Sequence, residues 1–366
     1  MRHLLLFFCS CFFLLLFSQC DTYKADPTLK LFPFYKKNQY GFMDSTGKAV
    51  IPAKFDAVKE FQEGVAAAQE NGQWGFIRQD GEWLIEPAYE ELYSFSDGLA
   101  AFAETENGKL GFLNEKGQVV ILPTYDFVKP FQGGLAAVSQ GDRWHFINKE
   151  GEKVFENSFS YAENFHEGLA VVQNADGAFQ YINEKGDYLT DDAYLLAQNF
   201  QENWALVADG IQGAEDQPDS LIYHFINAQG KVQLTNLPYD IVTPFSEGLA
   251  GVALTEGQGQ DTLLVGIIDK KGREVVAPTY ESTYGIVFVH YQEGLSPVME
   301  DNTWGYLNKK GALAIPIQYQ EAGNFKNGLA LVKKEDKIYY INPKGEQIGK
   351  EWEYDTNTTF VLNFQR

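Results

Sequence analysis

A short motif recurs eight times along the chain at nearly constant spacing, and this repetition limits what the chain can fold into. Each copy begins with Phe or Tyr, turns at a Gly in seven of the eight copies, and continues into small apolar residues. The turn position recurs after 34, 36, 34, 35, 45, 46 and 34 residues, so the unit is about 35 residues long with two longer copies. A unit of this size cannot bury its own apolar face, so neighbouring units must pack into one continuous core. The framework glycines are Gly64, Gly98, Gly134, Gly168, Gly248, Gly294 and Gly328, and Asn203 takes their place in the fifth copy.

Two further marks in each unit indicate β-strands joined by tight turns. Residues 74–77 and 304–307 begin with the framework residues Trp74 and Trp304 and alternate large apolar with small side chains, which is the period of a strand. An Asx-x-x-Gly tetrapeptide follows in most copies, for example at residues 114–117. The Asx side chain opens a type I turn and the Gly closes the hairpin with a bulge. Each unit is therefore predicted to hold about three short antiparallel strands and one irregular crossing segment.

The spacing of about 35 residues is also that of helical tetratricopeptide repeats. Three or four fixed Gly and Pro positions in every unit exclude that alternative, because a helix interior tolerates neither residue well. We predict an all-β array of about eight to nine repeats. An open or curled solenoid is favoured because the unit lengths vary and the first and last copies are incomplete, and a closed propeller-like ring is the alternative. Most aromatic side chains are expected in the core.

The repeated unit resembles the WG repeat family, also called KWG repeats. The resemblance is carried in one unit by Trp74, Gly75, Gly81, Pro87, Tyr89, Phe95 and Gly98, and it recurs from about residue 40 to about residue 348. It implies a β-rich repeat array of the kind found in bacterial surface or periplasmic proteins, with no general catalytic activity. Three copies depart from it, since His145, Gln180 and His224 replace the Gly of the Trp-Gly pair. The close backbone approach that Gly permits is in question at these copies.

The first twenty residues have the pattern of a bacterial export signal. A cationic start precedes the 14-residue apolar run 4–17, which is too short to span a bilayer. Cys20 then resembles the lipidated cysteine of a bacterial lipoprotein, which is the favoured interpretation, and a small residue near an ordinary cleavage site is the alternative. We predict a signal peptide at residues 1–19, a lipid anchor and tether at 20–38, the repeat array at 39–350 and a C-terminal cap at 351–366. The protein is then exported to the periplasm or cell surface and held at a membrane through Cys20.

The charge of the chain and the absence of known catalytic motifs argue against several functional classes. The chain has 29 Lys and Arg against 50 Asp and Glu, a net charge of -21, which argues against a nucleic-acid partner because phosphate binding needs a basic surface. All three cysteines lie within the first twenty residues, so the remaining chain has no thiolate for a metal or a disulfide. Motifs of serine hydrolases, zinc peptidases and phosphate loops are absent from the sequence. A glycosidase-like carboxylate pair stays compatible with it, but no pair stands out. We predict no enzymatic activity, no cofactor and no metal, with His145 and His224 as framework residues.

Two copies break the repeat by lengthening a hairpin, at residues 208–220 and 255–262. Equivalent loops of adjacent repeats lie side by side, and insertions often map to the binding face. Together with residues 282–290 these loops are predicted to form a recognition patch, and tolerated loop growth is the alternative. The candidate binding residues are Asp209, Glu215, Asp216, Asp219, Glu256, Asp261, Tyr284 and Phe288.

These features favour a non-enzymatic β-repeat scaffold that mediates protein–protein interaction at the bacterial cell envelope. The alternative is a carbohydrate-binding module for envelope polysaccharide, in which exposed aromatic side chains such as Tyr284 and Phe288 stack on sugars. The expected partner is an unidentified envelope protein or glycan and not a nucleic acid, and the membrane is contacted only through the lipid anchor.

Overall fold

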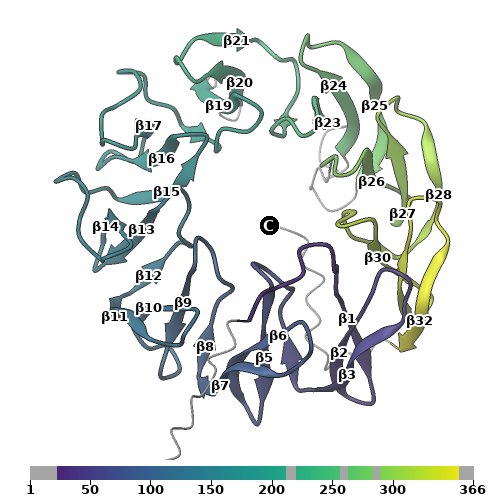
Figure 1. Ribbon diagram of the computed structural model, residues 1–366. Coiled ribbons are helices and arrows are strands. Elements are labelled where there is room, and N and C mark those ends of the chain that lie inside the picture. The colour runs from purple at the N-terminus through teal and green to yellow at the C-terminus, as the bar shows by residue number, and fades with distance from the viewer. Residues whose placement is uncertain (1–22, 212–219, 256–262, 283–288, 354–366) are drawn as a thin grey trace, which may run out of the picture.

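The structure is a computed structural model that describes residues 23–211, 220–255, 263–282 and 289–353. Within these ranges the chain forms strands and turns without a helix, and its strands make nine antiparallel sheets that stand as blades around a ring (Figure 1). The all-β class is confirmed, and of the two predicted arrangements the propeller-like ring is the one observed. With no helix in the described ranges, none of them offers a helical segment able to cross a membrane.

The blades follow one another in chain order. Blade 1 comprises β1 (Phe32–Lys36), β2 (Gln39–Met43) and β3 (Ala49–Phe55). Blade 2 comprises β4 (Ala57–Val58), β5 (Val65–Glu70), β6 (Gln73–Arg78) and β7 (Trp83–Tyr89). Blade 3 comprises β8 (Glu91–Leu92), β9 (Leu99–Ala103), β10 (Leu110–Asn114) and β11 (Val119–Tyr125). Blade 4 comprises β12 (Phe127–Val128), β13 (Leu135–Gln140) and β14 (Arg143–Asn148). Blade 5 comprises β15 (Tyr161–His166), β16 (Leu169–Gln173) and β17 (Phe179–Asn183). Blade 6 comprises β18 (Leu196–Ala197), β19 (Trp204–Ile211), β20 (Ser220–Asn227) and β21 (Val232–Leu234). Blade 7 comprises β22 (Ile241–Val242), β23 (Leu249–Thr255), β24 (Leu263–Asp269) and β25 (Glu274–Ser282). Blade 8 comprises β26 (Leu295–Glu300), β27 (Thr303–Asn308) and β28 (Leu313–Tyr319). Blade 9 comprises β29 (Glu321–Ala322), β30 (Ala330–Lys334), β31 (Lys337–Ile341) and β32 (Gln347–Glu353).

In most blades the predicted crossing segment contains a short strand. Strands β4, β8, β12, β18, β22 and β29 are two residues long and pair at one edge of their sheets. That edge faces the centre of the ring, since β23, β26 and β30 lie nearer the centre while β25, β28 and β32 lie outside (Figure 1). The predicted irregular segment thus contains a two-residue strand in these units and then continues without regular structure to the Phe of the framework turn. Two residues are too few to show alternation in the sequence.

The folded array begins before the predicted boundary at residue 39. Strand β1 starts at Phe32, and the residues before it pack on blade 2. The hydroxyl of Tyr23 donates to the carbonyl oxygen of Gly64 (2.8 Å), and the amide of Asp26 donates to Oε1 of the buried Gln79 (2.8 Å). Residues 23–31 are thus part of the ring rather than a tether, and β32 likewise extends past the predicted end at residue 350. The predicted signal peptide and Cys20 lie outside the described residues.

Both predicted turns are confirmed. Oδ1 of Asn114 accepts the amides of Lys116 and Gln118 (3.0 Å each), and Gly117 has φ 73°, which closes the hairpin. In the Phe-x-x-Gly turn both central residues have positive φ, 51° at Glu63 and 84° at Gly64, so the turn is of type I′.

The residue before the framework glycine joins one blade to the next. The carboxylate of Glu63 accepts the amides of Asp97 (2.8 Å) and Gly98 (3.1 Å) in the following blade. A glutamate with positive φ is strained, so this hydrogen bond to a neighbouring turn offsets a local cost. The same carboxylate-to-amide bond links Asp97 to Gly134, Glu167 to Asn203, Glu202 to Gly248, Glu247 to Gly294 and Glu293 to Gly328.

A repeated aromatic pair forms the core between adjacent blades. In each pair the aromatic residue of a middle strand contacts the Phe that opens the next blade's turn. The ring centroids lie 4.4 to 5.0 Å apart, and such a pair contributes about 0.5–1.5 kcal/mol beyond its buried area. The pairs are Phe42–Phe61, Phe76–Phe95, Phe112–Phe131, Phe146–Phe165, Tyr181–Phe200, Phe225–Phe245 and Tyr306–Phe325. The expectation that aromatic residues of neighbouring units form a continuous core is confirmed.

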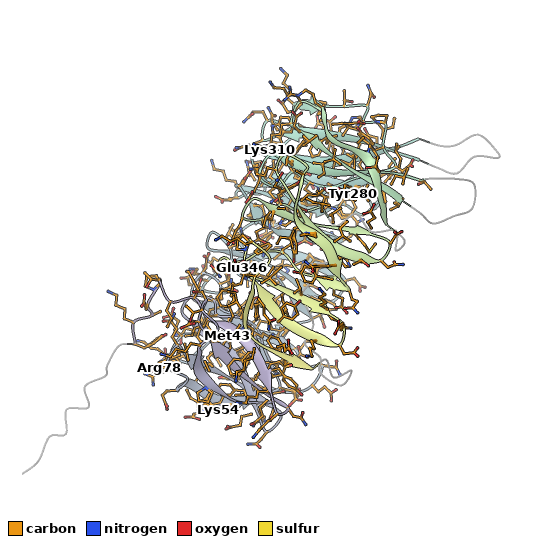
Figure 2. The ribbon with its side chains drawn as sticks, turned by 90° about the vertical axis from the view of Figure 1, so that its right-hand side faces the viewer. Met43, Lys54, Arg78, Tyr280, Lys310 and Glu346 are labelled. Atoms are coloured by element: carbon orange, nitrogen blue, oxygen red, sulfur yellow. The ribbon has the colours of Figure 1, made fainter. Side chains whose placement is uncertain are left out.

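The last blade packs on the first and closes the ring. Phe32 and Met43 of blade 1 are buried in one cluster with Tyr340 and Trp352 of blade 9, and the rings of Phe32 and Tyr340 lie 5.5 Å apart. Met43 of blade 1 and Glu346 of blade 9 are labelled in the side view of the ring (Figure 2). This cluster buries two faces that an open solenoid would leave exposed.

A glycine in the middle strand lets the outer strand cross close above it in the regular blades. A Cβ on Gly75 would lie 2.5 Å from the carbonyl oxygen of Ile85 and 2.8 Å from the nitrogen of Pro87, both in β7. A Cβ would likewise lie 2.5 to 2.8 Å from the nearest atom of the outer strand at Gly41, Gly111, Gly266 and Gly305. The recurring glycine of the Trp-Gly position therefore reflects a close contact between two backbones.

Outer strands change where that glycine is missing. In blade 4, which has His145, pairing is reduced to the isolated bridges Trp144↔Phe159 and Ile147↔Lys153. Blade 5, which has Gln180, keeps two bridges in the same register, and blade 6, which has His224, keeps only the three-residue β21. Blade 9 has Tyr339 but a full outer strand, and there Gly349 with φ 75° lies on the outer strand itself. The departures noted in the sequence thus alter the structure as the steric argument requires.

We expect Gly75→Ala to destabilise the protein by about 1–3 kcal/mol, because β7 must move away from the added methyl group. Urea unfolding followed by tryptophan fluorescence measures this. Gly323→Ala is the control, since its Cβ would come no closer than 3.4 Å to the carbonyl oxygen of Leu331. Equal stability of Gly75→Ala and the wild type would show that the close passage is not a constraint.

Candidate functional site

The inner edge of the ring carries lysines that are bound to the next blade. Lys59 follows β4, and its Nζ lies 5.4 Å from the ring centre of Trp74 and 4.6 Å from that of Tyr93, while donating to the carbonyl oxygen of Leu92 (2.8 Å). Burial lowers the pKa of Lys59, although the charge of Glu91 opposes this. The cation is therefore engaged within the protein and does not form an anion site.

Lys129 holds the equivalent position between blades 4 and 5. Its Nζ donates to Oε1 of Glu163 (2.8 Å) and to the hydroxyl of Tyr161 (3.1 Å), and the Tyr161 hydroxyl also contacts Glu163. Burial alone would lower the pKa of Lys129, but the bonds to Glu163 and Tyr161 outweigh it and the pKa is raised. Lys129 stays charged and fixes both side chains of β15 in place.

Three aromatic side chains, of which Phe127 is exposed, lie beside Lys129 and Glu163. Phe127 is 64% exposed and stacks on Trp144 with centroids 6.4 Å apart and planes 15° apart, and Trp144 meets Tyr161 edge-on at 5.6 Å. Phe127 and Trp144 both pair with the small residue Ser139, which leaves room for the two rings on one face of the sheet. Phe127, Trp144, Tyr161, Lys129 and Glu163 are called here the inner-edge cluster. It offers an aromatic face, a carboxylate and a neutralised lysine.

Sequence reasoning missed this cluster. Its aromatic residues were assigned to the core, which holds for most aromatic side chains in the described chain but not for Phe127. A signal existed, because the position of Phe127 is occupied by Glu91 in the preceding unit, and a glutamate does not suit a core position.

The predicted recognition patch can be compared with the structure only at Asp209. Glu215, Asp216, Asp219, Glu256, Asp261, Tyr284 and Phe288 lie outside the described residues. Asp209 is part of strand β19 rather than a loop, because β19 and β20 extend the hairpin as far as Ile211 and Ser220. Its Oδ2 lies 3.1 Å from Nε2 of His224. The two lengthened hairpins belong to neighbouring blades 6 and 7.

Acidic side chains also gather on the outer side of blade 2. Glu70, Glu86 and Glu90 line an open hollow of about 550 Å³ between the β5–β6 hairpin and β7. Within the described ranges, no three His, Cys, Asp or Glu side chains are grouped so as to hold a metal ion.

The sequence profile described as WG containing repeat matches residues 40–74, 74–109, 111–144, 146–177, 225–254, 266–304 and 304–337, more than half of the chain. The chain belongs to this WG repeat family. The profile leaves residues 178–224 of the WG repeat protein unmatched, and this stretch contains Gln180 and His224, two of the positions where the Trp-Gly glycine is replaced. None of the curated proteins matches its sequence.

Solved structures resemble the fold of this WG repeat protein at low sequence identity. A crystal structure of the eukaryotic initiation factor has 13% identity and a TM-score of 0.59, with 89% of this chain and 96% of that chain covered. BamB from Moraxella catarrhalis has 11% identity, 81% and 96% coverage and a TM-score of 0.41. Hsv2 from Kluyvelomyces marxianus has 10% identity, 72% and 98% coverage and a TM-score of 0.40. The first of these supports the ring of antiparallel blades, and at such identities the likeness concerns the fold alone.

Proposed function

We propose that this WG repeat protein is a non-enzymatic scaffold that binds a basic protein partner at the bacterial cell envelope. The proposal is supported by the positions of three lysine side chains, whose charged groups are bound within the protein. Lys59 and Lys129 are held in contacts between blades, and Lys270 likewise lies 5.2 Å from the ring of Trp204 and 3.2 Å from Glu202. These contacts keep three cations within the protein, and the excess of 50 Asp and Glu over 29 Lys and Arg favours a partner of the opposite charge.

The inner-edge cluster supplies the apolar part of such an interface. Phe127 is an aromatic side chain more than half exposed, and Trp144 supports it from behind. Aromatic anchors surrounded by polar groups are typical of the residues that carry binding energy in protein interfaces. Arg or Lys of a basic partner can stack on the Phe127 ring, while the chain's excess of carboxylates attracts the charge.

Carbohydrate binding is the second candidate, and the same aromatic side chains favour it. The nearly parallel rings of Phe127 and Trp144 present a flat face, and the carboxylate of Glu163 could accept hydroxyl hydrogen bonds beside it. The predicted sugar-stacking residues Tyr284 and Phe288 lie outside the described residues, so Phe127 is the aromatic residue on which this candidate now rests.

Capture of proteins and binding of polysaccharides, each compared between the wild type and Phe127→Ala, separate the two candidates. The purified protein is cross-linked in extracts of its native cells, partners are identified by mass spectrometry, and the same protein is applied to an array of envelope polysaccharides. We expect net-basic proteins as partners and at least a five-fold loss of their capture with Phe127→Ala. Leu313→Ala, an exposed side chain on the outer strand of blade 8, is the matched control and should change nothing.

Polysaccharide binding that depends on Phe127, without a protein partner, would favour the carbohydrate candidate. Protein capture that is unaffected by Phe127→Ala would contradict the role given to the inner-edge cluster.

We further propose that the protein is exported and lipid-anchored through Cys20, which follows from the apolar run before it. Mass spectrometry of the mature N-terminus, taken from membrane and soluble fractions, measures this. We expect an acylated Cys20 in the membrane fraction. An unmodified N-terminus near residue 20 in the soluble fraction would contradict the anchor and leave export standing.

A further inference from the structure

The N-terminal segment 23–31 lies on one particular face of the ring. It crosses directly over Gly64, where an added Cβ would meet the Cβ of Ala25 at 2.1 Å. The hydroxyl of Tyr23 donates to the carbonyl oxygen of Gly64 (2.8 Å), and the amide of Gln79 donates to that hydroxyl (3.1 Å). Gly64 belongs to the framework turn of blade 2, and Gln79 belongs to the hairpin between β6 and β7. The segment is therefore fixed on the face where these two turns lie.

Every blade presents the same two turns on this face. In blade 2 Val65 pairs with Arg78 at the end that carries both turns, and Glu70 pairs with Gln73 at the other end. Nine equivalent hairpins are each closed by a hydrogen bond from the amide of the first residue to the carbonyl oxygen of the fifth, at residues 44–48, 78–82, 114–118, 148–152, 183–187, 227–231, 269–273, 308–312 and 342–346. The bonds between successive framework turns keep them on one side of the ring, called here the turn face.

The side view separates the turn face from the opposite end of the blades. Lys310 belongs to a turn-face hairpin and lies on the left of the upper blades (Figure 2). Tyr280 is close to the opposite end of blade 7, and it lies to the right of Lys310 in the same view.

The proposed lipid anchor is close to the turn face along the chain. Two residues separate Cys20 from Tyr23, so the backbone between them can span at most about 10 Å. A lipid on Cys20 lies in the bilayer, and Tyr23 is bonded to the turn face. The anchor therefore holds the turn face of blade 2 within about 10 Å of the membrane surface.

The two ends of the blades differ in charge. The nine turn-face hairpins contain 12 Lys and Arg against 10 Asp and Glu, a net charge of +2. Seven hairpins at the opposite end lie within the described residues, and they contain 6 Lys and Arg against 9 Asp and Glu, a net charge of -3. These seven are residues 36–39, 70–73, 103–110, 140–143, 173–179, 300–303 and 334–337.

Positive charge on the turn face is concentrated in blades 6 to 8. Their three hairpins contain six cationic residues against the single carboxylate of Asp269. Three of the cations pair with carboxylates of the same face, namely Lys270 with Glu202, Lys309 with Glu247 and Arg273 with Asp269. Glu293, the framework carboxylate of blade 8, accepts the amide of Gly328. The other three cations, Lys231, Lys271 and Lys310, are exposed and are called here the basic patch.

The candidate recognition surfaces lie toward the opposite end. Phe127 and Trp144 both pair with Ser139, next to the hairpin that joins β13 to β14. The described ends of the two lengthened hairpins, at Ile211 and Thr255, are at this end of blades 6 and 7 as well. A surface that covers the turn face therefore leaves the inner-edge cluster accessible to a partner.

We propose that the turn face lies against the bilayer in the anchored protein and that the basic patch contacts anionic lipid headgroups. The inference rests on the proposed lipid anchor, and it extends the predicted membrane contact from the acyl chains to one face of the ring. A lipid anchor and a basic surface commonly act together at membranes, because headgroup phosphates attract lysines that the anchor has brought near. The inner-edge cluster then faces partners away from the membrane.

Energy transfer from two positions on one blade to the lipid headgroups tests this orientation. Glu184→Cys lies on the turn face of blade 5 and Ala175→Cys lies at its opposite end, and both positions are exposed. The five residues of β17 separate them by about 17 Å. Each introduced cysteine is the single free thiol, because the signal peptide with Cys9 and Cys11 is removed and the sulfur of Cys20 carries the lipid.

The acylated protein, labelled with a donor fluorophore at either position, is inserted into preformed vesicles of phosphatidylglycerol and phosphatidylcholine that contain a headgroup-labelled acceptor lipid. We expect the transfer efficiency to be about two-fold higher or more from Glu184→Cys than from Ala175→Cys. High salt should reduce this difference, because it screens the attraction between lysines and phosphates.

Charge reversal on the two ends of the blades identifies the residues responsible. Lys271→Glu combined with Lys310→Glu should bring the two transfer efficiencies toward equality, because the basic patch then repels the headgroups. Lys36→Glu combined with Lys37→Glu is the matched control, since it reverses two exposed charges at the opposite end and should leave the difference unchanged. Circular dichroism and thermal unfolding confirm that all variants fold.

The anchor and the orientation can fail separately. An acylated Cys20 with equal transfer from the two positions, or with higher transfer from Ala175→Cys, would overturn the orientation and leave the anchor standing. Equal effects of the two charge reversals would overturn the role of the basic patch. An unmodified N-terminus would overturn the anchor and the orientation together, while capture of partners through Phe127 tests the scaffold independently of both.

Discussion

The close passage of the outer strand over a middle-strand glycine is the constraint on which the regular blades depend. At Gly75 the backbone of β7 comes so near that any side chain at that position would collide with it. This passage produces the register shifts between β6 and β7 and returns Tyr89 to pair with Trp74. The chain then enters the next blade at β8, and beyond this strand Phe95 packs on Phe76. The glycine thus allows the outer strand to pair closely within the blade, and this pairing directs the chain toward the next blade.

Three of the four blades that lack this glycine depart from the regular repeat, whereas blade 9 keeps a full outer strand that carries Gly349, with φ 75°, on the outer strand itself. Blades 4 to 6 are consecutive, and their outer strands are reduced to isolated bridges or to the short β21. The stacked Phe127 and Trp144 lie in this arc. Repeat positions that violate the local rule coincide with this candidate binding surface, as expected if local regularity is given up for function.

Sequence alone predicted the features that depend on local chemistry. The Asx-x-x-Gly hairpins, the turns at the framework glycines and the all-β class follow from backbone preferences that each unit shows in full. Ring closure could not be predicted in this way, because it rests on contact between Phe32 and Tyr340, which are distant in sequence, and on small rotations that add up over nine blades. The inner-edge cluster was missed because an exposed Phe127 and a buried Phe131 look alike in a sequence. His224 is a framework residue as predicted, and its ring nitrogens contact Asp209 and Thr235.

Hydrogen–deuterium exchange of the outer strands tests the link between the glycine and the blade most directly. The account predicts slow exchange for residues 83–89, 119–125, 274–282 and 313–319, whose strands are paired along most of their length. It predicts exchange about ten-fold faster or more for residues 152–159, 187–194 and 235–239, which lie where the glycine is replaced. Equal protection of the two groups would contradict the account, because the outer strands would then be seated without the glycine.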